Sequence, residues 1–241
     1  KQLTDVALGR YFLLIAWAGL YIALGNAEMA RASERREGEY KRAAKAAELR
    51  SLRYQVNPHF LFNTLNSLSA LVMTGKGQAA ETMIQALSSF YRRSLAEDPT
   101  GDVGLDQEVA LQRAYLQIEA ARFPDRLVTR FDIPEALEGA SVPGMILQPL
   151  VENAVKYAVA PTRKPVTVTI AAREEAGRLV IEVSDNGPGA PHGKAGFGIG
   201  LANVRDRLAA RYGPEAGLVA GPAEDGGWRA VLRLPFEPHG R

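Results

Sequence analysis

The chain has 241 residues, of which 46% are hydrophobic and 23% are charged, a composition typical of folded globular proteins and too apolar for a disordered chain. Its 29 Lys and Arg against 27 Asp and Glu leave a net charge of +2, too small for a global field that attracts nucleic acid. The absence of cysteine excludes a disulfide framework and a thiol nucleophile, and three scattered histidines disfavour a histidine-ligated metal site. The length fits one or two domains.

The first 27 residues predict a transmembrane helix, the end of a longer membrane sensor. Between Asp5 and Glu28 lie 22 residues with one charge, Arg10, and at about 1.5 Å per residue they reach about 33 Å. The uninterrupted apolar run from Tyr11 to Gly25 has only 15 residues, so a buried core helix is the alternative. Residues 28–53 hold eight Lys and Arg against five Asp and Glu, which favours a cytoplasmic position for everything after residue 28.

The next part of the chain predicts helices. Residues 28–48 are rich in Ala, Glu, Lys and Arg and read as a juxtamembrane helical linker. Two further helices, about 49–73 with a kink at Pro58 and about 78–97, predict a helical hairpin over 49–97. We expect a connecting helix at about 105–123 and a linker within 98–139.

The remainder predicts a mixed α/β unit. A helix at about 144–158 is followed by apolar strand patterns at 166–170 and 179–183. A glycine-rich stretch at 187–200 precedes a helix at about 201–212, and a strand near 228–234 completes the unit. Helices first and a mixed unit second indicate two domains with a boundary near residues 128–140.

One histidine of the first hairpin helix lies on a polar face. At about 100° per residue, four apolar side chains form a stripe that we expect to be buried, and three polar side chains lie opposite. The stripe is Leu61, Leu65, Leu68 and Val72, and the polar group is His59, Asn63 and Asn66. A neutral imidazole there is a nucleophile suited to carrying a phosphoryl group, although a lone helical histidine is more often a surface or capping residue.

The segment around this histidine, QVNPHFLFNTLNSL at 55–68, resembles the phosphoacceptor box of the LytS-type sensor histidine kinases of bacteria. Ten consecutive residues, NPHFLFNTLN, match that pattern, and the resemblance continues through LDQEVALQRAYLQIEAARFPDRL at 105–127. The resemblance implies that His59 is phosphorylated and that residues 49–97 dimerise as half of a four-helix bundle. It also implies that residues 140–237 form a GHKL-type α/β sandwich that binds ATP.

The sequence LQPLVENAVKYAV at 147–159 resembles the asparagine box of that family. The resemblance implies that Asn153 binds Mg²⁺ between the ATP phosphates, and an amide oxygen is a suitable hard ligand for this ion. Lys156 would then offer a cation to phosphate, and Tyr157 would lie near the adenine base. The family usually has His-Gly after the lysine, whereas this chain has Tyr157 and Ala158.

Two glycine-rich motifs follow in the order that the family has. DNGPG at 185–189 resembles the first glycine box, whose aspartate, Asp185 here, accepts a hydrogen bond from the adenine amino group. GFGIGLANVRDRL at 196–208 resembles the second box, whose backbone amides and helix start face the phosphates. The ATP-binding residues implied by the two boxes are Asp185, Gly187, Gly189, Gly196, Gly198, Gly200 and Leu201. Either motif alone would be weak, since DNG by itself predicts a hairpin turn.

The asparagine box lacks the residue that water activation needs. GHKL proteins that hydrolyse ATP carry a glutamate four residues before the asparagine, and Pro149 occupies that position here. Glu152 precedes Asn153 directly and so points about 100° away around the helix. Transfer to a protein nucleophile is therefore favoured over hydrolysis.

No general base is evident next to the phosphoacceptor. Many histidine kinases have an acidic residue directly after the histidine, but Phe60 occupies that position here, as in the LytS type. Asn63 is a candidate for orienting the His59 ring.

These features favour a protein-histidine kinase of a two-component system, membrane-anchored and homodimeric. By resemblance, it transfers the γ-phosphoryl group of Mg·ATP to His59 and then to an aspartate of a response regulator, typically of the LytTR type, without touching nucleic acid itself. Its expected location is the bacterial inner membrane, with the catalytic part in the cytoplasm. Two alternatives remain, a nucleotide-binding dimeric scaffold and a protein that acts mainly as a phosphatase toward the regulator.

Overall fold

A computed structural model describes residues 17, 58–96, 101–188, 198–224 and 226–238. The chain divides into two units, residues 1–57 and 58–241, and the described elements belong to the second. Apart from residue 17, the predicted membrane helix at 1–27 and the linker at 28–48 lie outside the described residues. Within the described part of the chain, no helix combines the length and the apolar character needed to cross a membrane.

The hairpin consists of α2 (Pro58–Met73) and α3 (Gly77–Ala96). Gly75 has a φ of 72°, a conformation that costs glycine little, and it ends α2. The amide of Lys76 then donates to the Leu71 carbonyl at 2.9 Å, the long-range hydrogen bond of a Schellman motif. The described parts of the two predicted hairpin helices are thus helical, and the loop lies at the glycine-rich position where the sequence predicted it.

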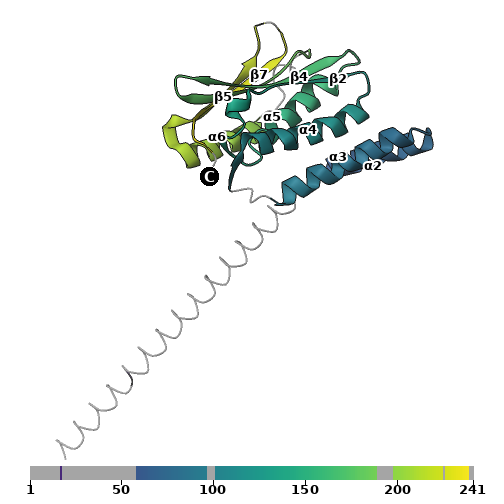
Figure 1. Ribbon diagram of the computed structural model, residues 1–241, viewed down its shortest axis with the longest axis horizontal. Helices are drawn as coiled ribbons and strands as arrows, with labels where there is room; N and C mark the ends of the chain where they lie inside the picture. The colour runs from purple at the N-terminus through teal and green to yellow at the C-terminus, as the bar shows by residue number, and fades with distance from the viewer. Residues whose placement is uncertain (1–16, 18–57, 97–100, 189–197, 225, 239–241) are drawn as a thin grey trace, which may run out of the picture. The chain divides into compact units, whose positions relative to one another are not determined.

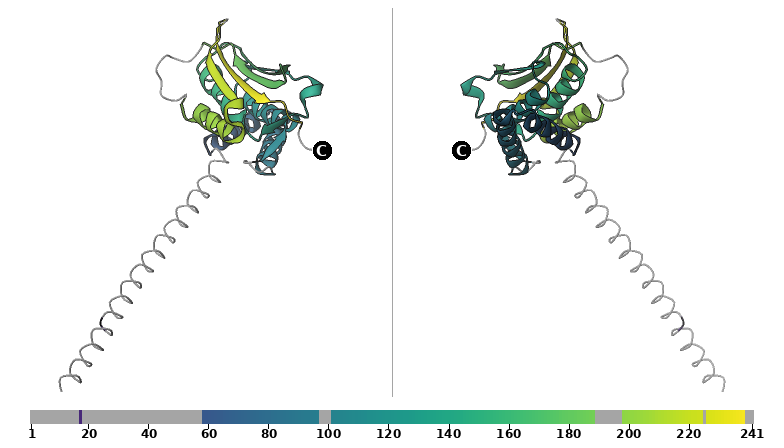
Figure 2. Two further views of the ribbon diagram at one scale, coloured as in Figure 1. Left: turned by 90° about the vertical axis from the view of Figure 1, so that its left-hand side faces the viewer. Right: turned by 90° about the vertical axis from the view of Figure 1, so that its right-hand side faces the viewer.

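A five-stranded sheet forms the other side of the unit, in the order β2-β4-β5-β7-β6. The strands are β2 (Leu127–Asp132), β4 (Val166–Glu175), β5 (Arg178–Asp185), β6 (Gly217–Pro222) and β7 (Trp228–Pro235). β2 runs parallel to β4 and the other pairs are antiparallel. Three helices, α4 (Leu105–Arg122), α5 (Gln148–Ala154) and α6 (Gly198–Tyr212), cover one face of this sheet (Figures 1 and 2). The result is the two-layer α/β sandwich that the sequence analysis expected.

The linker predicted within 98–139 is partly wrong, because this stretch contributes strands. β1 (Asp102–Gly104) pairs with β3 (Ser141–Pro143), and β2 forms an edge of the large sheet. The Arg113 guanidinium of α4 lies 3.8 Å from the Phe131 ring centre and ties β2 to the helix. β2 was missed because most of its side chains are exposed at a sheet edge and do not alternate. A domain boundary at 128–140 would cut β2 from the sheet.

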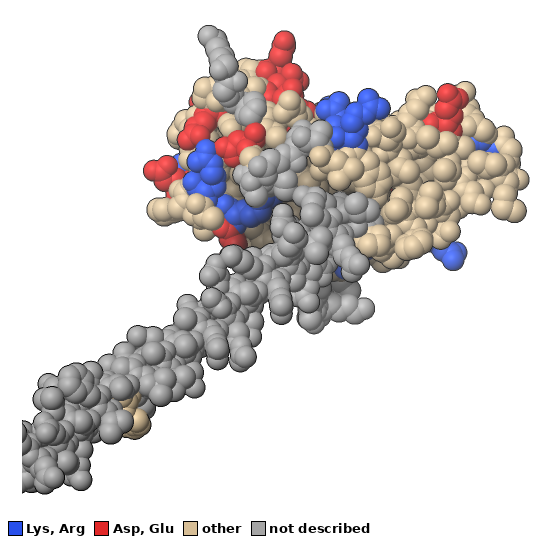
Figure 3. Space-filling view, turned by 90° about the horizontal axis from the view of Figure 1, so that it is seen from below, with Lys and Arg blue, Asp and Glu red and all other residues tan. Residues whose placement is uncertain are grey.

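The apolar stripe predicted on α2 is not a buried stripe in the described chain. Leu65 is 46% exposed and Val72 63% exposed, whereas the buried residues of α2 are Phe60 and Thr64. The hairpin therefore packs on α4 through a face that lies to one side of the predicted stripe. The surface formed by the hairpin is largely uncharged (Figure 3). We define the apolar hairpin face as the exposed side chains Phe62, Leu65, Val72 and Met73.

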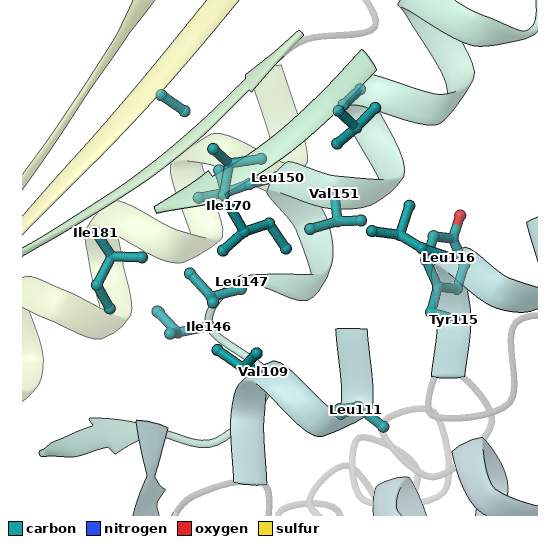
Figure 4. Close-up of a cluster of buried hydrophobic side chains, with 14 of the residues drawn as sticks. Val109, Leu111, Tyr115, Leu116, Ile146, Leu147, Leu150, Val151, Ile170 and Ile181 are labelled. Carbon is teal, nitrogen blue, oxygen red and sulfur yellow. The ribbon is translucent and has the colours of Figure 1, made fainter. Parts of the chain in front are cut away.

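The core lies between the sheet and the helices (Figure 4). Alternate side chains of β4 and β5 point into it, as a half-buried strand requires. The residues that meet there from the strands and helices include Val109, Leu116, Ile146, Leu147, Leu150, Val151, Ile170 and Ile181. This core holds α4 and α5 against the sheet.

Candidate active site

His59 lies at the second residue of α2, exposed to solvent. The amide nitrogen of Asn63, one turn further, is 3.1 Å from its Nε2 and 3.2 Å from its Nδ1. The structure thus brings together the predicted phosphoacceptor and its candidate orienting residue, because residues four apart share a helix face.

The neighbour of His59 anchors this part of the helix. Phe60 is buried, and its ring centre lies 5.2 Å from that of Tyr115 on α4 and 5.3 Å from that of Phe90 on α3. We call these three side chains the aromatic trio. The Thr64 hydroxyl, also buried, donates to the Phe60 carbonyl at 2.8 Å. Since Phe60 points into the trio, the preceding His59 points outward.

Asp185 lies at the end of β5 and is only 8% exposed. Its Oδ1 accepts a hydrogen bond from the Gly187 amide at 3.0 Å. Burial raises the pKa of Asp185 above its ordinary value, and hydrogen bonds from the backbone of Gly187 and Trp228 partly oppose the shift. A carboxylate with backbone amides on one side keeps acceptor capacity for a ligand donor.

Two glycines allow the backbone to approach Asp185 closely. A Cβ on Gly187 would overlap Ala158, and a Cβ on Gly227, whose φ is 82°, would overlap the Asp185 carbonyl. The side chain of Asn186 accepts a hydrogen bond from the Thr167 amide at 2.7 Å and so ties the loop at Asn186 and Gly187 to β4. The DNG motif is therefore a closely packed loop beside Ala158, which follows α5 in the chain.

Asn153 lies on α5, partly exposed, and the start of α6 lies next to it. A Cβ added at Gly200 would lie 4.0 Å from the Asn153 amide nitrogen and 3.5 Å from Pro149. The second glycine box and the asparagine box are therefore adjacent in space. Within the described residues, no group of three or more His, Cys, Asp or Glu side chains could hold a metal ion. The donor set at Asn153 is then one amide oxygen, which fits Mg²⁺ because this ion takes most of its ligands from phosphate and water.

Glu152 faces α4 rather than the glycine boxes. Its carboxylate accepts from Gln148 at 3.0 Å, and its charge acts on Tyr115 and Glu119 of α4. Burial raises the pKa of Glu119, the ion pair with Arg122 opposes this shift, and Glu152 adds to it. This placement agrees with the expectation that Glu152 cannot replace a water-activating glutamate.

The predicted continuous helix over 144–158 is wrong at both ends, because residues 144–147 form a turn before α5 and the α-helix stops at Ala154. After α5 the chain forms a π-helical turn, Val155–Val159, closed by a hydrogen bond of 2.9 Å from the Ala160 amide to the Val155 carbonyl. Such turns are frequent at functional sites. This one contains Lys156 and Tyr157, and the Lys156 ammonium lies 4.8 Å from the Tyr157 ring centre. The turn coincides with the positions where the chain departs from the His-Gly of its family.

The remaining predicted ATP-binding residues fall into two groups. Gly189 and Gly196 lie outside the described residues. Gly198 begins α6 and Gly200 follows in its first turn, whereas Leu201 is buried in the core.

Sequence reasoning missed Glu108 and Arg207. Glu108 of α4 is fully buried and accepts hydrogen bonds from the backbone amides of Met145 and Leu147, just before α5. Arg207 of α6 donates to the Gly144 carbonyl at 2.8 Å. A signal was present, since Glu108 lies three residues after Leu105 and one before Val109, and a charge in such an apolar row needs a buried partner.

Comparison with known proteins places this architecture in a class. Residues 141–238 match the family described as "Histidine kinase-, DNA gyrase B-, and HSP90-like ATPase", which accounts for the sandwich and its glycine and asparagine boxes. Residues 47–127, which contain His59, match the family described as "Histidine kinase". The chain belongs to the histidine kinases, and its resemblance to the LytS type is confirmed.

Named relatives agree with this assignment. The chain is 38% identical over 202 residues to the sensor histidine kinase BtsS of Escherichia coli K12, a match that covers 83% of this chain and 36% of the relative. It is 39% identical over 184 residues to the sensor protein LytS of Staphylococcus saprophyticus, covering 71% and 31%. The chain thus spans about a third of the length of these relatives.

Among solved structures, the chain is similar to the histidine kinase domain of the Erythrobacter litoralis EL346 blue-light activated histidine kinase. The match has a TM-score of 0.47 and 16% identity, and it covers 78% of this chain and 90% of that one.

The raised pKa of Asp185 predicts a pH dependence of stability. Because the folded state binds this proton more tightly than the unfolded state, the stability of the unaltered protein relative to Asp185→Asn is highest below the ordinary pKa of 3.8. It falls as the pH rises through the raised pKa, by about 1.4 kcal/mol for each unit of elevation. Urea unfolding of both proteins without nucleotide, from about pH 3.5 to about pH 7, measures this difference.

The variant Asp106→Asn, at an exposed position in the first turn of α4, controls for the loss of a carboxylate. A stability difference between Asp185→Asn and the unaltered protein that moved in the opposite direction with pH would contradict the prediction.

Proposed function

We propose that this chain is the kinase part of a two-component sensor, which phosphorylates His59 from Mg·ATP and passes the phosphoryl group to an aspartate of a response regulator. One observation carries the proposal. The exposed His59, with Asn63 beside it, belongs to the same compact unit as the loop of Asp185 and the helix of Asn153. Family membership supports the same activity.

The transfer step follows from the chemistry of imidazole. A ring nitrogen with a free lone pair attacks the γ-phosphorus, the bond from phosphorus to the β–γ bridging oxygen breaks, and ADP leaves. The proton on the other ring nitrogen is then released. The Asn63 amide nitrogen, which is a donor, is the atom next to the ring. It would orient the imidazole by donating to the unprotonated ring nitrogen, and this hydrogen bond would be released when that nitrogen attacks.

The nucleotide is held by this chain's own groups. Asp185 would accept a hydrogen bond from the adenine amino group. The start of α6, with Gly198 and Gly200, would present backbone amides to the phosphates. Asn153 would hold Mg²⁺, which supplies neutralisation of phosphate charge when bound, and Lys156 would add a second cation. Pro149 at the position of a water-activating glutamate supports transfer to protein rather than to water.

The apolar hairpin face supports a homodimer. Phe62, Leu65, Val72 and Met73 are exposed within about 100° of one another around α2. Apolar patches of this kind mark interaction surfaces. A second copy of the hairpin would cover this face and complete a four-helix bundle.

The remaining parts of the proposal concern location and partner. We propose that residues 1–27 anchor the chain in the bacterial inner membrane with the kinase in the cytoplasm, since this segment is apolar and precedes a basic stretch. Recovery of the full chain in the soluble fraction without detergent would contradict this. The resemblance to the LytS type supports a LytTR-type regulator, which would contact DNA in place of this chain. Failure of the phosphorylated protein to label such a regulator would count against that partner.

The central test is phosphorylation of the full chain in mild detergent with γ-labelled ATP and Mg²⁺. We expect label that is lost in acid and retained in alkali, as for phosphohistidine, and no label in His59→Gln. Asn153→Ala should lose both label and nucleotide binding. Persistence of label in His59→Gln would exclude this acceptor, and binding of ATP without any label in the unaltered chain would favour a scaffold or a phosphatase.

A second prediction separates the role of Asn63 from general damage to α2. Asn63→Ala should lower the initial rate of label incorporation by about tenfold or more, because the ring loses its orienting partner, while the dissociation constant of ATP stays unchanged. Asn66→Ala, three residues along the same polar face, is the matched control. Equal rates in the two variants would remove Asn63 from the proposed mechanism.

A third prediction concerns the dimer. Val72→Glu should raise the dimer dissociation constant about tenfold or more, because each copy would bury an unpaired carboxylate in the interface. Ala70→Glu, also exposed, lies about 160° from Val72 around α2 and outside the apolar hairpin face, about 60° beyond Met73, and should change it far less. Sedimentation velocity over a concentration series measures both, and an equal response of the two variants would exclude the apolar hairpin face as the interface.

A further inference from the structure

Charged side chains from α4 and α6 both form hydrogen bonds with the turn that leads into α5. This turn, Pro143–Leu147, closes with a hydrogen bond of 3.2 Å from the Ile146 amide to the Pro143 carbonyl. Its third residue, Met145, has a φ of 57°, a conformation that glycine usually supplies at this position of a type II turn. A side chain there is strained, so the turn needs contacts from elsewhere to hold it.

The first of these side chains is Glu108 on α4, whose carboxylate is buried. Its Oε2 accepts from the Met145 amide at 2.7 Å, and its Oε1 accepts from the Leu147 amide at 2.9 Å. Gln112 donates to the same Oε1 at 3.2 Å. A carboxylate with no exposed surface is stable only when it is paired and hydrogen-bonded, and two of its donors are backbone amides of the turn.

The second of these side chains is Arg207 on α6, which donates a hydrogen bond to the Gly144 carbonyl at 2.8 Å. Burial lowers the pKa of Arg207, and the charges of Glu108 and Asp102 oppose that shift. The charge interaction between Arg207 and Glu108 therefore acts across the turn. Glu108 accepts hydrogen bonds from two amides of the turn, and Arg207 donates one to a carbonyl of the turn.

Arg207 also lies in line with the glycine box. At about 100° per residue, Gly200 and Arg207 are about 20° apart on α6 and so share one face. On this face, Gly200 approaches Pro149 and Asn153 of α5, and two turns later Arg207 holds the turn that begins α5. The separation between α5 and α6 is therefore set at two points, at Gly200 and at Arg207. The point at Gly200 lies at the end where we propose that the nucleotide binds.

We propose that Glu108 and Arg207 are positioning residues that, through the Pro143–Leu147 turn, set the spacing between the Asn153 helix and the glycine-box helix and thereby the affinity for nucleotide. The inference rests on the proposed function, because it requires that ATP binds between these two helices. Neither side chain touches the nucleotide in this scheme.

The test compares two arginines of α6 that lie one turn apart. Arg207→Gln removes the guanidinium that donates to the Gly144 carbonyl of the turn. Arg211→Gln removes the 2.8 Å ion pair with Asp102 on β1 and is the matched control. The dissociation constant of Mg·ATP for the full chain is measured by calorimetry at a temperature where circular dichroism shows each variant folded. We expect Arg207→Gln to weaken binding about tenfold and Arg211→Gln to weaken it less than about twofold.

Two further variants keep the test decisive if Arg207→Gln does not fold. Arg207→Lys keeps the charge beside Glu108 and should recover most of the affinity, and Glu108→Gln, which loses one acceptor oxygen, should weaken binding as Arg207→Gln does. The rise in melting temperature produced by saturating Mg·ATP should shrink in step with the lost affinity. A purely structural role would lower the melting temperature without nucleotide and leave that rise and the affinity unchanged.

The outcomes separate the two levels of the argument. Affinities within about twofold of one another for the Arg207→Gln and Arg211→Gln variants, or unchanged affinity in Glu108→Gln, would overturn the positioning role and leave the kinase proposal intact. Absence of ATP binding in the unaltered chain would overturn both.

Discussion

Helix α4 is buried around most of its circumference, and the two proposed functional parts of the unit are both positioned against it. On one face Tyr115 completes the aromatic trio that holds Phe60 and so directs His59 outward. Two turns earlier on the same face, Glu108 binds the backbone in front of the Asn153 helix. Because a helix buried nearly all round cannot shift without breaking many contacts, the proposed phosphoacceptor and the proposed nucleotide-binding helix share one rigid reference.

The polar groups within this burial explain its specificity. Apolar packing alone would tolerate small rotations of α4, since dispersion contacts are weakly directional. A buried carboxylate that must keep two backbone donors tolerates far less, because each unmade hydrogen bond would leave a desolvated group. Glu108 therefore determines how the turn before α5 sits, while the core around Leu116 and Val151 supplies most of the stabilising free energy.

The described part of the proposed nucleotide site is built on close backbone approaches. Gly187 and Gly227 remove Cβ atoms where loops pass Asp185, and the π-helical turn places Lys156 beside the Tyr157 ring. Ala158, where the family has glycine, packs directly against Gly187. The departure from the family pattern is therefore accommodated within the fold by a glycine on the opposing loop.

The sequence by itself determined what depends on local pattern: the hairpin helices, α4 and α6, and the central strands β4 and β5. Its motifs also predict the site residues His59, Asn153 and Asp185. Only the tertiary structure decided which face of α2 is buried, that β2 and β6 complete the sheet, and that α5 ends in a π-helical turn. It alone brought Glu108 and Arg207 to the same turn before α5. The physical reason is that periodicity and turn chemistry report on neighbours along the chain, whereas edge strands, buried charges and helix spacing depend on partners many residues away.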